Sequence, residues 1–306
     1  MKDNVFVFDS PYTLLLYCVL YPDNIFNTIY VHSNNNALNR LDFDSKRHIV
    51  INKGRGKLEK ILLYVFFKLR TIFNKELRYI VRHPKEFNFY GQDHLFFSAP
   101  FVHDFVLIED GLANYKIPKY SKLYTFFLGA KTFGRSGKVK QILLSGMMKI
   151  KEPEILNKVQ YFDLLVKWNS LTPEQKNNVN NFFRFTNTDE IEADVVILTQ
   201  PLSEYGFITE SEKIDIYQKL ISEYDGHNVV IRRHPREMTC YPDYFPNVKV
   251  NDSKVPIELI LLNSPSIRRG VTLFSSGIFN LPCQYKDFKG TSYHPLLLQK
   301  FGEINP

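Results

Sequence analysis

Two neighbouring carboxylates followed by a glycine form the first group of residues that could do chemistry. Glu109, Asp110 and Gly111 come directly after the apolar run Phe105–Ile108, which is typical of a buried strand. A glycine allows the chain to turn sharply and a ligand to approach closely, and a carboxylate at such a turn can act as a general base. The alternative is an ordinary turn, because Asp-Gly pairs are common turn formers.

A histidine among arginines forms the second group. Arg233, His234 and Pro235 follow an apolar run that is typical of a strand. Imidazole can donate a proton near neutral pH and arginine favours bound anions, so this combination suits the stabilisation of a phosphate leaving group. A structural histidine is the alternative, since His-Pro pairs also occur at residues 83–84 and 294–295. Among the three pairs, only the one at 234 follows a clean strand-like run.

Hydroxyl and carboxyl groups near two predicted helix starts form the third group. Ser275 and Ser276 follow the apolar run 271–274 and would open a helix. Two hydroxyls and free backbone N–H groups at a helix N-terminus can hold phosphate, although simple capping of the helix is the alternative. Glu258 lies in the first turn of another predicted helix. Its charge suits the helix dipole there, and it could also accept hydrogen bonds from ribose hydroxyls.

Short apolar runs alternate with helical patterns along the chain, and these elements must position the three groups. In the first part we predict strands over residues 4–8, 28–31, 48–51, 105–108 and 162–166, and helices over 11–20 and 173–183. In the second part we predict strands over 195–198, 228–232, 248–250 and 271–274, and helices over 210–224 and 256–262.

A polar stretch without apolar periodicity, residues 185–194, separates the two series of elements. We therefore predict one domain over residues 1–188 and another over 189–306. Strands that alternate with helices form parallel sheets with helices on their faces, so the predicted fold class is α/β, with two Rossmann-like domains facing a cleft. Ligands of such sheets bind outside the carboxyl ends of the strands, where the candidate residues lie.

Length and composition are those of an ordinary globular protein. The 306 residues allow two domains, and 44% hydrophobic and 23% charged residues exclude collagen-like and disordered chains. The three cysteines are far apart and contain no CxxC, so neither a zinc site nor a disulfide framework is indicated, and a reducing compartment is expected. The N-terminus lacks the pattern of a signal peptide, and the most apolar stretch, 61–73, is too short to span a membrane. We expect a soluble or peripheral protein.

Positive charge gathers in two windows of the chain. Residues 46–82 contain 11 Lys and Arg against two acids, and residues 116–151 contain nine with no acid. The segment 57–70 mixes Lys and Arg with Phe, Leu and Tyr, which is typical of a helix with one apolar face and a basic flank. It is either the solvated side of a core helix or a surface attracted to anionic lipid or glycan. No nucleic acid partner is expected, because no known nucleic-acid-binding signature accompanies the charge.

The order of these motifs resembles that of the bacterial sialyltransferases that share a D/E-D/E-G motif, an HP motif and a Ser-Ser/Thr motif. Among them, the chain is most similar to glycosyltransferase family 52, the lipooligosaccharide sialyltransferase family. Two further segments are similar to that family: the N-terminal strand that runs into DSPYTLLLY (9–17), and TQPLSEYGFIT (199–209).

The resemblance implies a GT-B fold and an inverting, metal-independent transferase that uses CMP-sialic acid and needs no cofactor. The implied residue roles are a general base at Asp110 supported by Glu109, a general acid or phosphate stabiliser at His234, a phosphate site at Ser275 and Ser276, a ribose-binding acid at Glu258, and an alternative base at Glu204. The other implied partner is a glycan acceptor, with galactose of lipooligosaccharide or capsule as the expected terminal sugar.

The two basic windows predict a cytoplasmic protein that is peripheral on the inner face of the bacterial plasma membrane, where a glycolipid acceptor would lie. The resemblance further implies a homodimer. Two alternatives remain open. The first is a GT-B glycosyltransferase that uses another nucleotide sugar. The second is a non-catalytic basic protein that binds membranes or polyanions, in which the acidic-Gly and His-Pro motifs are only turns.

Overall fold

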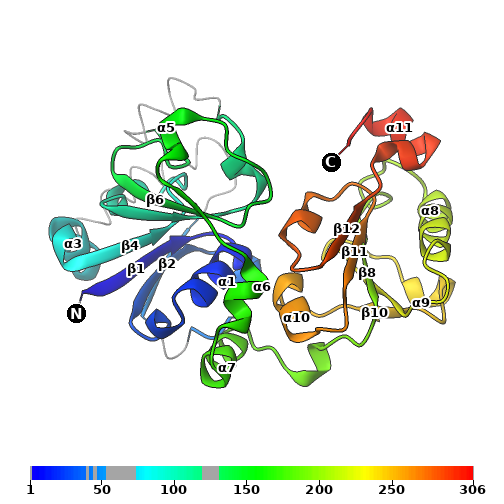
Figure 1. The fold of residues 1–306 in the computed structure, drawn as a ribbon, viewed down its shortest axis with the longest axis horizontal. Helices are drawn as coiled ribbons and strands as arrows, with labels where there is room; N and C mark the ends of the chain where they lie inside the picture. Colours follow the sequence, from blue (N-terminus) through cyan, green and yellow to red (C-terminus); the bar gives the residue numbers. More distant parts are fainter. Residues whose placement is uncertain (1, 39–40, 44–46, 53–73, 119–130, 306) are drawn as a thin grey trace. The chain divides into compact units, whose positions relative to one another are not determined.

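The computed structural model of the protein describes residues 2–38, 41–43, 47–52, 74–118 and 131–305. The chain forms two compact units, Met1–Arg184 and Phe185–Pro306. Each unit has its own parallel sheet and its own hydrophobic core (Figure 1). The chain passes from the first unit to the second after Arg184, whereas the sequence places the boundary after residue 188.

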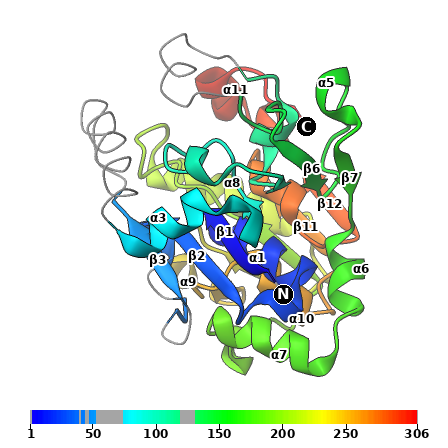
Figure 2. The ribbon, with the colours of Figure 1, turned by 90° about the vertical axis from the view of Figure 1, so that its left-hand side faces the viewer.

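A seven-stranded parallel sheet, in the order β3-β2-β1-β4-β5-β6-β7, forms the centre of the first unit. Its strands are β1 (Asp3–Phe8), β2 (Thr28–Ser33), β3 (His48–Ile51), β4 (Phe87–Gly91), β5 (Phe105–Ile108), β6 (Val139–Leu144) and β7 (Val159–Tyr161). Figure 2 shows β1, β2 and β3 side by side. The strand order reverses between β1 and β4, and the carboxyl ends of strands at such a switch point leave a crevice for ligands.

Helices cover both faces of this sheet. The helices are α1 (Pro11–Leu20), α3 (Lys75–Arg82), α5 (Pro153–Leu156), α6 (Leu164–Asn169) and α7 (Pro173–Phe182). Successive residues of β1 point to opposite faces. Val5 lies in a core cluster with Leu77 of α3, whereas Phe6 stacks on Tyr17 of α1 with ring centroids 4.2 Å apart. Both faces are therefore buried, as a parallel sheet requires.

A five-stranded parallel sheet, in the order β10-β9-β8-β11-β12, forms the centre of the second unit. Its elements are β8 (Val195–Leu198), α8 (Glu210–Ser222), β9 (Val229–Arg232), α9 (Tyr241–Tyr244), β10 (Lys249–Asn251), α10 (Ile257–Asn263), β11 (Arg269–Thr272), β12 (Tyr285–Phe288) and α11 (Pro295–Phe301). Figure 1 shows α8 and α10 on opposite sides of this sheet. The predicted α/β class with parallel sheets is confirmed in both units.

Several predicted elements differ from those in the structure. The strand predicted over 162–166 is wrong, because the side chain of Asp163 accepts a hydrogen bond from the backbone N–H of Val166 at 2.9 Å and begins helix α6 there. The strand predicted over 271–274 is β11, which ends at Thr272. The helix expected from Ser275 onward is a short 3₁₀-helix, η7 (Ser276–Asn280).

The basic segment 57–70 lies outside the described residues, so its helix and its proposed attraction to membranes stay predictions. None of the helices in the described ranges combines the length and the apolar character that crossing a membrane would need.

Candidate active site

Asp110 lies at the carboxyl edge of the first sheet, just past β5. Its Oδ1 accepts hydrogen bonds from Ser10 Oγ at 2.8 Å and from Thr13 Oγ1 at 3.2 Å, and its Oδ2 lies 3.4 Å from His94 Nε2. Ser10 also caps α1, so the start of that helix sets the position of the carboxylate. The Asp110 side chain keeps 23% exposure. A carboxylate that is oriented by hydroxyls and still reachable can take a proton from a bound molecule.

Gly111 makes the turn that follows this carboxylate. Its φ of 110° and ψ of −155° lie in a region that essentially only glycine adopts. The backbone N–H of Asp110 donates to Asn114 Oδ1 at 2.7 Å, which closes the turn. The motif is therefore a glycine-dependent turn, and the turn is what presents Asp110 at the edge. The motif can thus be a turn and also present a candidate general base, so these two interpretations of the sequence are compatible.

Glu109 is completely buried beside Asp110. Its carboxylate accepts hydrogen bonds from the hydroxyls of Tyr12 at 3.0 Å, Tyr115 at 2.5 Å and Ser145 at 2.8 Å. Burial raises the pKa of Glu109, and these hydrogen bonds oppose that rise. A buried, fully engaged carboxylate can anchor the turn. The supporting role that the resemblance implies for Glu109 stays a prediction.

His94 is a site residue that the sequence analysis missed. Its ring stacks on Phe133, with centroids 4.3 Å apart and 12° between the planes. Asp93 is buried and accepts hydrogen bonds at 2.8 Å from the backbone N–H groups of Phe133 and Gly134, which fixes Phe133 against His94. The polar run after β4 would have revealed His94, had the sequence analysis recognised β4 as a strand.

The second sheet brings two motifs to one edge through its register. Leu198 of β8 pairs with Arg232 of β9 on one side and with Thr272 of β11 on the other. Neighbouring strands lie about 4.8 Å apart, so Arg232 and Thr272 are separated by about 10 Å at the same level of the sheet. His234 and Ser275 follow these strand ends directly, and both lie at the carboxyl edge where nucleotides bind in such sheets.

The imidazole of His234 is held in one tautomer. Its Nδ1 accepts a hydrogen bond from the backbone N–H of Arg236 at 3.2 Å, so the proton of the neutral ring is on Nε2. Burial lowers the pKa of His234, which favours this neutral form. The backbone N–H of His234 donates to the buried Glu237 at 2.7 Å. The ring therefore offers an Nε2–H donor from an anchored turn.

A comparison of the three His-Pro pairs shows whether the dipeptide alone determines the hydrogen bond at Nδ1. At His294, Nδ1 accepts from the backbone N–H of Leu296 at 3.3 Å, the same arrangement as at His234. At His83, Nδ1 lies 3.0 Å from the carbonyl oxygen of Tyr79 instead. The dipeptide can thus form this turn in more than one place, and only its location after β9 distinguishes His234.

The two sequence neighbours of His234 differ in their surroundings: other protein groups contact Arg233, whereas Pro235 is exposed to solvent. Arg233 Nε lies 2.7 Å from Asp252 Oδ1, and its NH1 donates to the carbonyl oxygen of Thr239 at 3.2 Å. Arg233 is therefore oriented by the protein, and its remaining donors can meet an anion.

At the start of η7, Ser275 is half-buried and Ser276 is exposed. Ser275 Oγ accepts a hydrogen bond from the backbone N–H of Gly277 at 3.3 Å, so capping is one function that this serine performs. A capping hydroxyl keeps its own proton as a donor. Capping therefore does not prevent Ser275 from binding a phosphate oxygen.

Glu258 is buried near the start of α10. Burial raises its pKa, and the positive charge of Arg232 and a hydrogen bond from Asn280 oppose that rise. Asn280 is the last residue of η7, so Glu258 belongs to the same part of the unit as the two serines.

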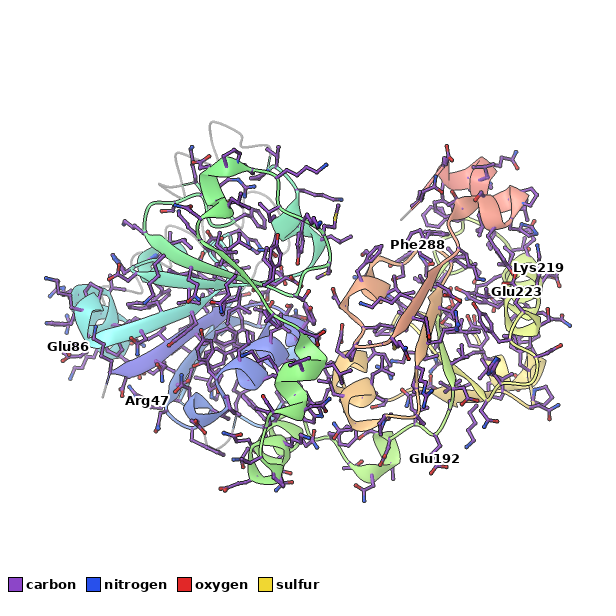
Figure 3. All side chains as sticks on the ribbon, in the orientation of Figure 1. Arg47, Glu86, Glu192, Lys219, Glu223 and Phe288 are labelled. Carbon is purple, nitrogen blue, oxygen red and sulfur yellow. The ribbon has the colours of Figure 1, made fainter. Side chains whose placement is uncertain are left out.

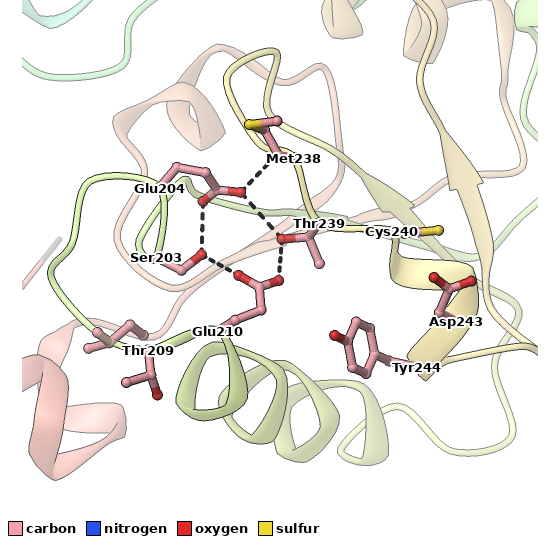
Figure 4. A pocket seen from close by; sticks show the side chains of 10 residues that line it. Ser203, Glu204, Thr209, Glu210, Met238, Thr239, Cys240, Asp243 and Tyr244 are labelled. Atoms are coloured by element: carbon pink, nitrogen blue, oxygen red, sulfur yellow. Dashed lines mark hydrogen bonds between the residues drawn. The ribbon is translucent and has the colours of Figure 1, made fainter.

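Glu204, the alternative base, is held by a buried lysine. Its carboxylate lies 2.9 Å from Lys213 Nζ and accepts the backbone N–H of Met238 at 2.7 Å. Glu204 lines a pocket of about 490 Å³. Figure 4 shows its hydrogen bonds to Met238, Thr239 and Ser203. Burial alone would raise the pKa of Glu204, but Lys213 and the Met238 N–H lower it to about 2. A carboxylate with so low a pKa is a weak base.

Within the described ranges, no group of three or more His, Cys, Asp or Glu side chains has the arrangement of a metal site. The metal independence that the resemblance implies stays a prediction.

Sequence comparison decides the family. The model of glycosyltransferase family 52 matches residues 31–297, which is most of the chain. The chain belongs to glycosyltransferase family 52. A family 52 assignment makes the protein a glycosyltransferase. It is also 37% identical over 222 residues to an uncharacterized protein of Haemophilus influenzae, a match that covers 70% of this chain and 72% of that protein.

Two solved structures resemble this family 52 chain in fold. An α/β-galactoside α-2,3-sialyltransferase from Photobacterium phosphoreum is 13% identical, with a TM-score of 0.55 over 93% of this chain and 88% of that one. The GT-B domain of a sialyltransferase from Photobacterium damselae is 10% identical, with a TM-score of 0.56 over 97% of this chain and 95% of that one. The family 52 chain therefore has the GT-B fold that the sequence predicts.

Proposed function

We propose that this glycosyltransferase is an inverting sialyltransferase that moves sialic acid from CMP-sialic acid to a sugar hydroxyl of a bacterial surface glycan. The observation that carries the proposal is the placement of Asp110, reachable and oriented by hydroxyls at the carboxyl edge of the first sheet, in a chain of family 52. The relatives with a similar fold that are named sialyltransferases support the choice of donor.

In this proposal the first unit activates the acceptor. The acceptor oxygen forms a bond to the anomeric carbon of sialic acid while its proton passes to Asp110. Ser10 and Thr13 orient the receiving carboxylate, and the fixed Gly111 turn keeps it at the edge. A correctly positioned general base supplies typically about 10²–10⁴-fold in rate.

The second unit holds the leaving group. As the bond between the anomeric carbon and the phosphate oxygen breaks, the electron pair stays with CMP, and negative charge grows on the phosphate. The Nε2–H of His234 and the hydroxyls of Ser275 and Ser276 would donate hydrogen bonds to that charge, and Glu258 would meet the ribose hydroxyls. Because the neutral His234 ring keeps its proton on Nε2, we propose phosphate stabilisation by a hydrogen bond as its main role.

Calorimetric titration of the purified chain with CMP, UDP and ADP in EDTA tests this function. We expect binding that is selective for CMP and weakened in the variant Ser275→Ala/Ser276→Ala. The transfer assay with CMP-sialic acid and galactose-terminated acceptors follows from that result. A preference for UDP or ADP would replace the donor but retain the transferase. Binding of none of the three would favour the non-catalytic alternative, which predicts salt-sensitive binding to anionic lipid.

We further propose that the enzyme associates with the inner face of the bacterial plasma membrane, as the charge of its sequence suggests. Positive residues at 53, 55, 57 and 60 would meet anionic headgroups. Sedimentation with anionic vesicles should fall when these charges are reversed, and unchanged sedimentation would contradict the idea. The homodimer and the lipooligosaccharide or capsule acceptor remain predictions from the resemblance.

A further inference from the structure

Lys213 is a cation that lies entirely inside the second unit. Its side chain has 0% exposure, although it belongs to α8, whose other lysine, Lys219, is exposed. The Lys213 ammonium lies 2.9 Å from the Glu204 carboxylate and 3.4 Å from that of Glu237. A lysine is almost never fully buried unless its charge is paired, so this placement requires an explanation.

Three carboxylates lie within 4 Å of Lys213 Nζ: Glu204, Glu237 and, at 3.7 Å, Glu210. Two of them, Glu204 and Glu237, hold the two ends of one short loop. Glu237 accepts the backbone N–H of His234 at 2.7 Å, and Glu204 accepts the backbone N–H of Met238 at 2.7 Å. The loop from His234 to Met238 is thus fixed at both ends through a single ammonium group. Figure 4 shows the end of this connection that joins Glu204 to Met238.

Glu237 combines several hydrogen bonds with the charge of Lys213 in one buried place. Besides His234, it accepts hydrogen bonds from the hydroxyls of Thr199 and of Tyr241, the latter at 2.7 Å. All three partners are used as donors. An ionised carboxylate only accepts hydrogen bonds, whereas a protonated carboxyl group carries an O–H donor, which cannot pair with another donor. A cation beside a buried carboxylate offsets part of the cost of burying a charge.

We infer that Lys213 is a positioning residue for His234: it pairs with Glu237 and Glu204, and these carboxylates fix the loop that carries the imidazole. The inference rests on the proposed function, because it gives the loop the task of placing His234 Nε2–H at the leaving phosphate. It also assigns Glu204 to the loop and not to proton transfer.

Hydrogen exchange of the full chain, measured together with CMP affinity, tests this role. The variant Lys213→Met removes the ammonium and retains a side chain of similar length. We expect backbone amides in a peptide over residues 233–240 to exchange about tenfold faster, while peptides from β11 and from the first sheet exchange as in the wild type. CMP affinity should fall about tenfold, the factor that corresponds to about 1.4 kcal/mol.

Lys219→Met is the matched control on the same helix. Lys219 lies on the exposed face of α8, where its Nζ is 4.7 Å from the centroid of the Tyr293 ring (Figure 3). This variant loses the same charge from the same helix but touches neither carboxylate. Exchange over residues 233–240 and CMP affinity should both stay at wild-type values.

Glu237→Gln extends the test in case Lys213→Met does not fold. The glutamine amide has the same shape as the carboxylate but no charge, and its NH₂ group would face the hydrogen-bond donors that surround Glu237. The backbone amides of residues 233–240 should therefore exchange faster even though Lys213 is present. In the double variant, the loss of CMP affinity should be clearly smaller than the sum of the two single losses, because both changes act on one network.

Unchanged exchange over residues 233–240 in Lys213→Met and Glu237→Gln would overturn the inference. Equally faster exchange throughout the second unit would also overturn it, because Lys213 would then serve general stability. Faster local exchange with unchanged CMP affinity would overturn the positioning of His234 at phosphate. If the wild type bound no CMP, the proposed function would fail, and the exchange data would still decide whether Lys213 fixes the loop.

Discussion

Asp110 in the first unit and Glu204 in the second are both carboxylates that follow a strand of a parallel sheet, yet the protein holds them differently. Hydroxyls of Ser10 and Thr13 orient Asp110, whereas the ammonium of Lys213 and a backbone N–H fix Glu204. The buried cation and the backbone N–H stabilise the charged form of Glu204 and lower its pKa to about 2, which makes Glu204 a weak base. The partners of a carboxylate, more than its place in the sheet, therefore indicate which of the two can be the base.

The sharpest way to break this comparison is to neutralise each carboxylate in turn. Asp110→Asn should lower kcat for transfer from CMP-sialic acid by about 10²–10⁴-fold, because the general base is lost. Glu204→Gln should lower it less than about tenfold, since it only loosens the loop at Met238. CMP affinity of Asp110→Asn serves as the control and should stay unchanged. A larger loss in Glu204→Gln than in Asp110→Asn would make Glu204 the base.

The acid stability of the second unit gives the next largest effect. The pKa of Glu204 is lowered to about 2 from its usual 4.5, so its contribution to stability is complete above pH 4.5 and is lost as the pH falls toward 2. Glu204→Gln should therefore reduce the free energy of unfolding by about 2 kcal/mol at pH 7. The difference from the wild type should shrink at pH 3 in urea unfolding experiments.

Glu192→Gln is the matched control for that measurement, since Glu192 is an exposed glutamate of the same unit (Figure 3). It should change stability by less than about 0.5 kcal/mol at either pH. A wild-type and Glu204→Gln difference that stays constant between pH 7 and pH 3 would contradict the ion pair with Lys213.

The turn at Gly111 tests the other side of the comparison. Gly111→Ala should cost about 1.5 kcal/mol of stability, because φ is 110° there and a side chain is strained in that region even though the space around it is open. Gly137→Ala is the control, since Gly137 has open space and no positive φ. Equal unfolding midpoints for the two variants would show that the turn does not depend on glycine.

The smallest expected effect concerns the imidazole beside Asp110. His94→Gln should lower kcat/KM by roughly fivefold, the loss of about 1 kcal/mol from one contact of Asp110. Phe133→Leu should act in the same direction, because Phe133 stacks on the His94 ring. If His94→Gln instead matched Asp110→Asn, His94 would share the proton transfer itself.

The sequence alone predicts the parallel α/β fold because the central strands β1, β5, β8 and β9 are short apolar runs. It misses β4, β6, β7 and β12, where polar or charged residues interrupt the apolar ones and the run is not recognisable. Missing β4 also hides His94, since a residue after an unrecognised strand has no assigned edge. The strand predicted over 162–166 fails because the capping by Asp163 outweighs the apolar residues that follow.

Some residues of the candidate site can likewise be identified from the sequence, and others cannot. Glu109, Asp110 and His234 are found from the sequence because each follows an apolar strand directly. Lys213 and Glu237 cannot be identified from the sequence in this way. A helical pattern around one and a polar loop around the other do not indicate that the two charged residues will be buried together. Tertiary pairing of charges is decided by packing, which no local pattern carries.

The pairing of the central strands also has a consequence for the synthesis of the protein. Residue 3 of β1 pairs with residue 87, and residue 195 of β8 pairs with residue 269, so each sheet joins strands far apart in the chain. While the ribosome works, β1 and β8 emerge long before these partners and expose apolar edges that could associate with other chains. Folding of each unit is therefore expected to be slow, and chaperone binding should concentrate on the newly made β1 and β8.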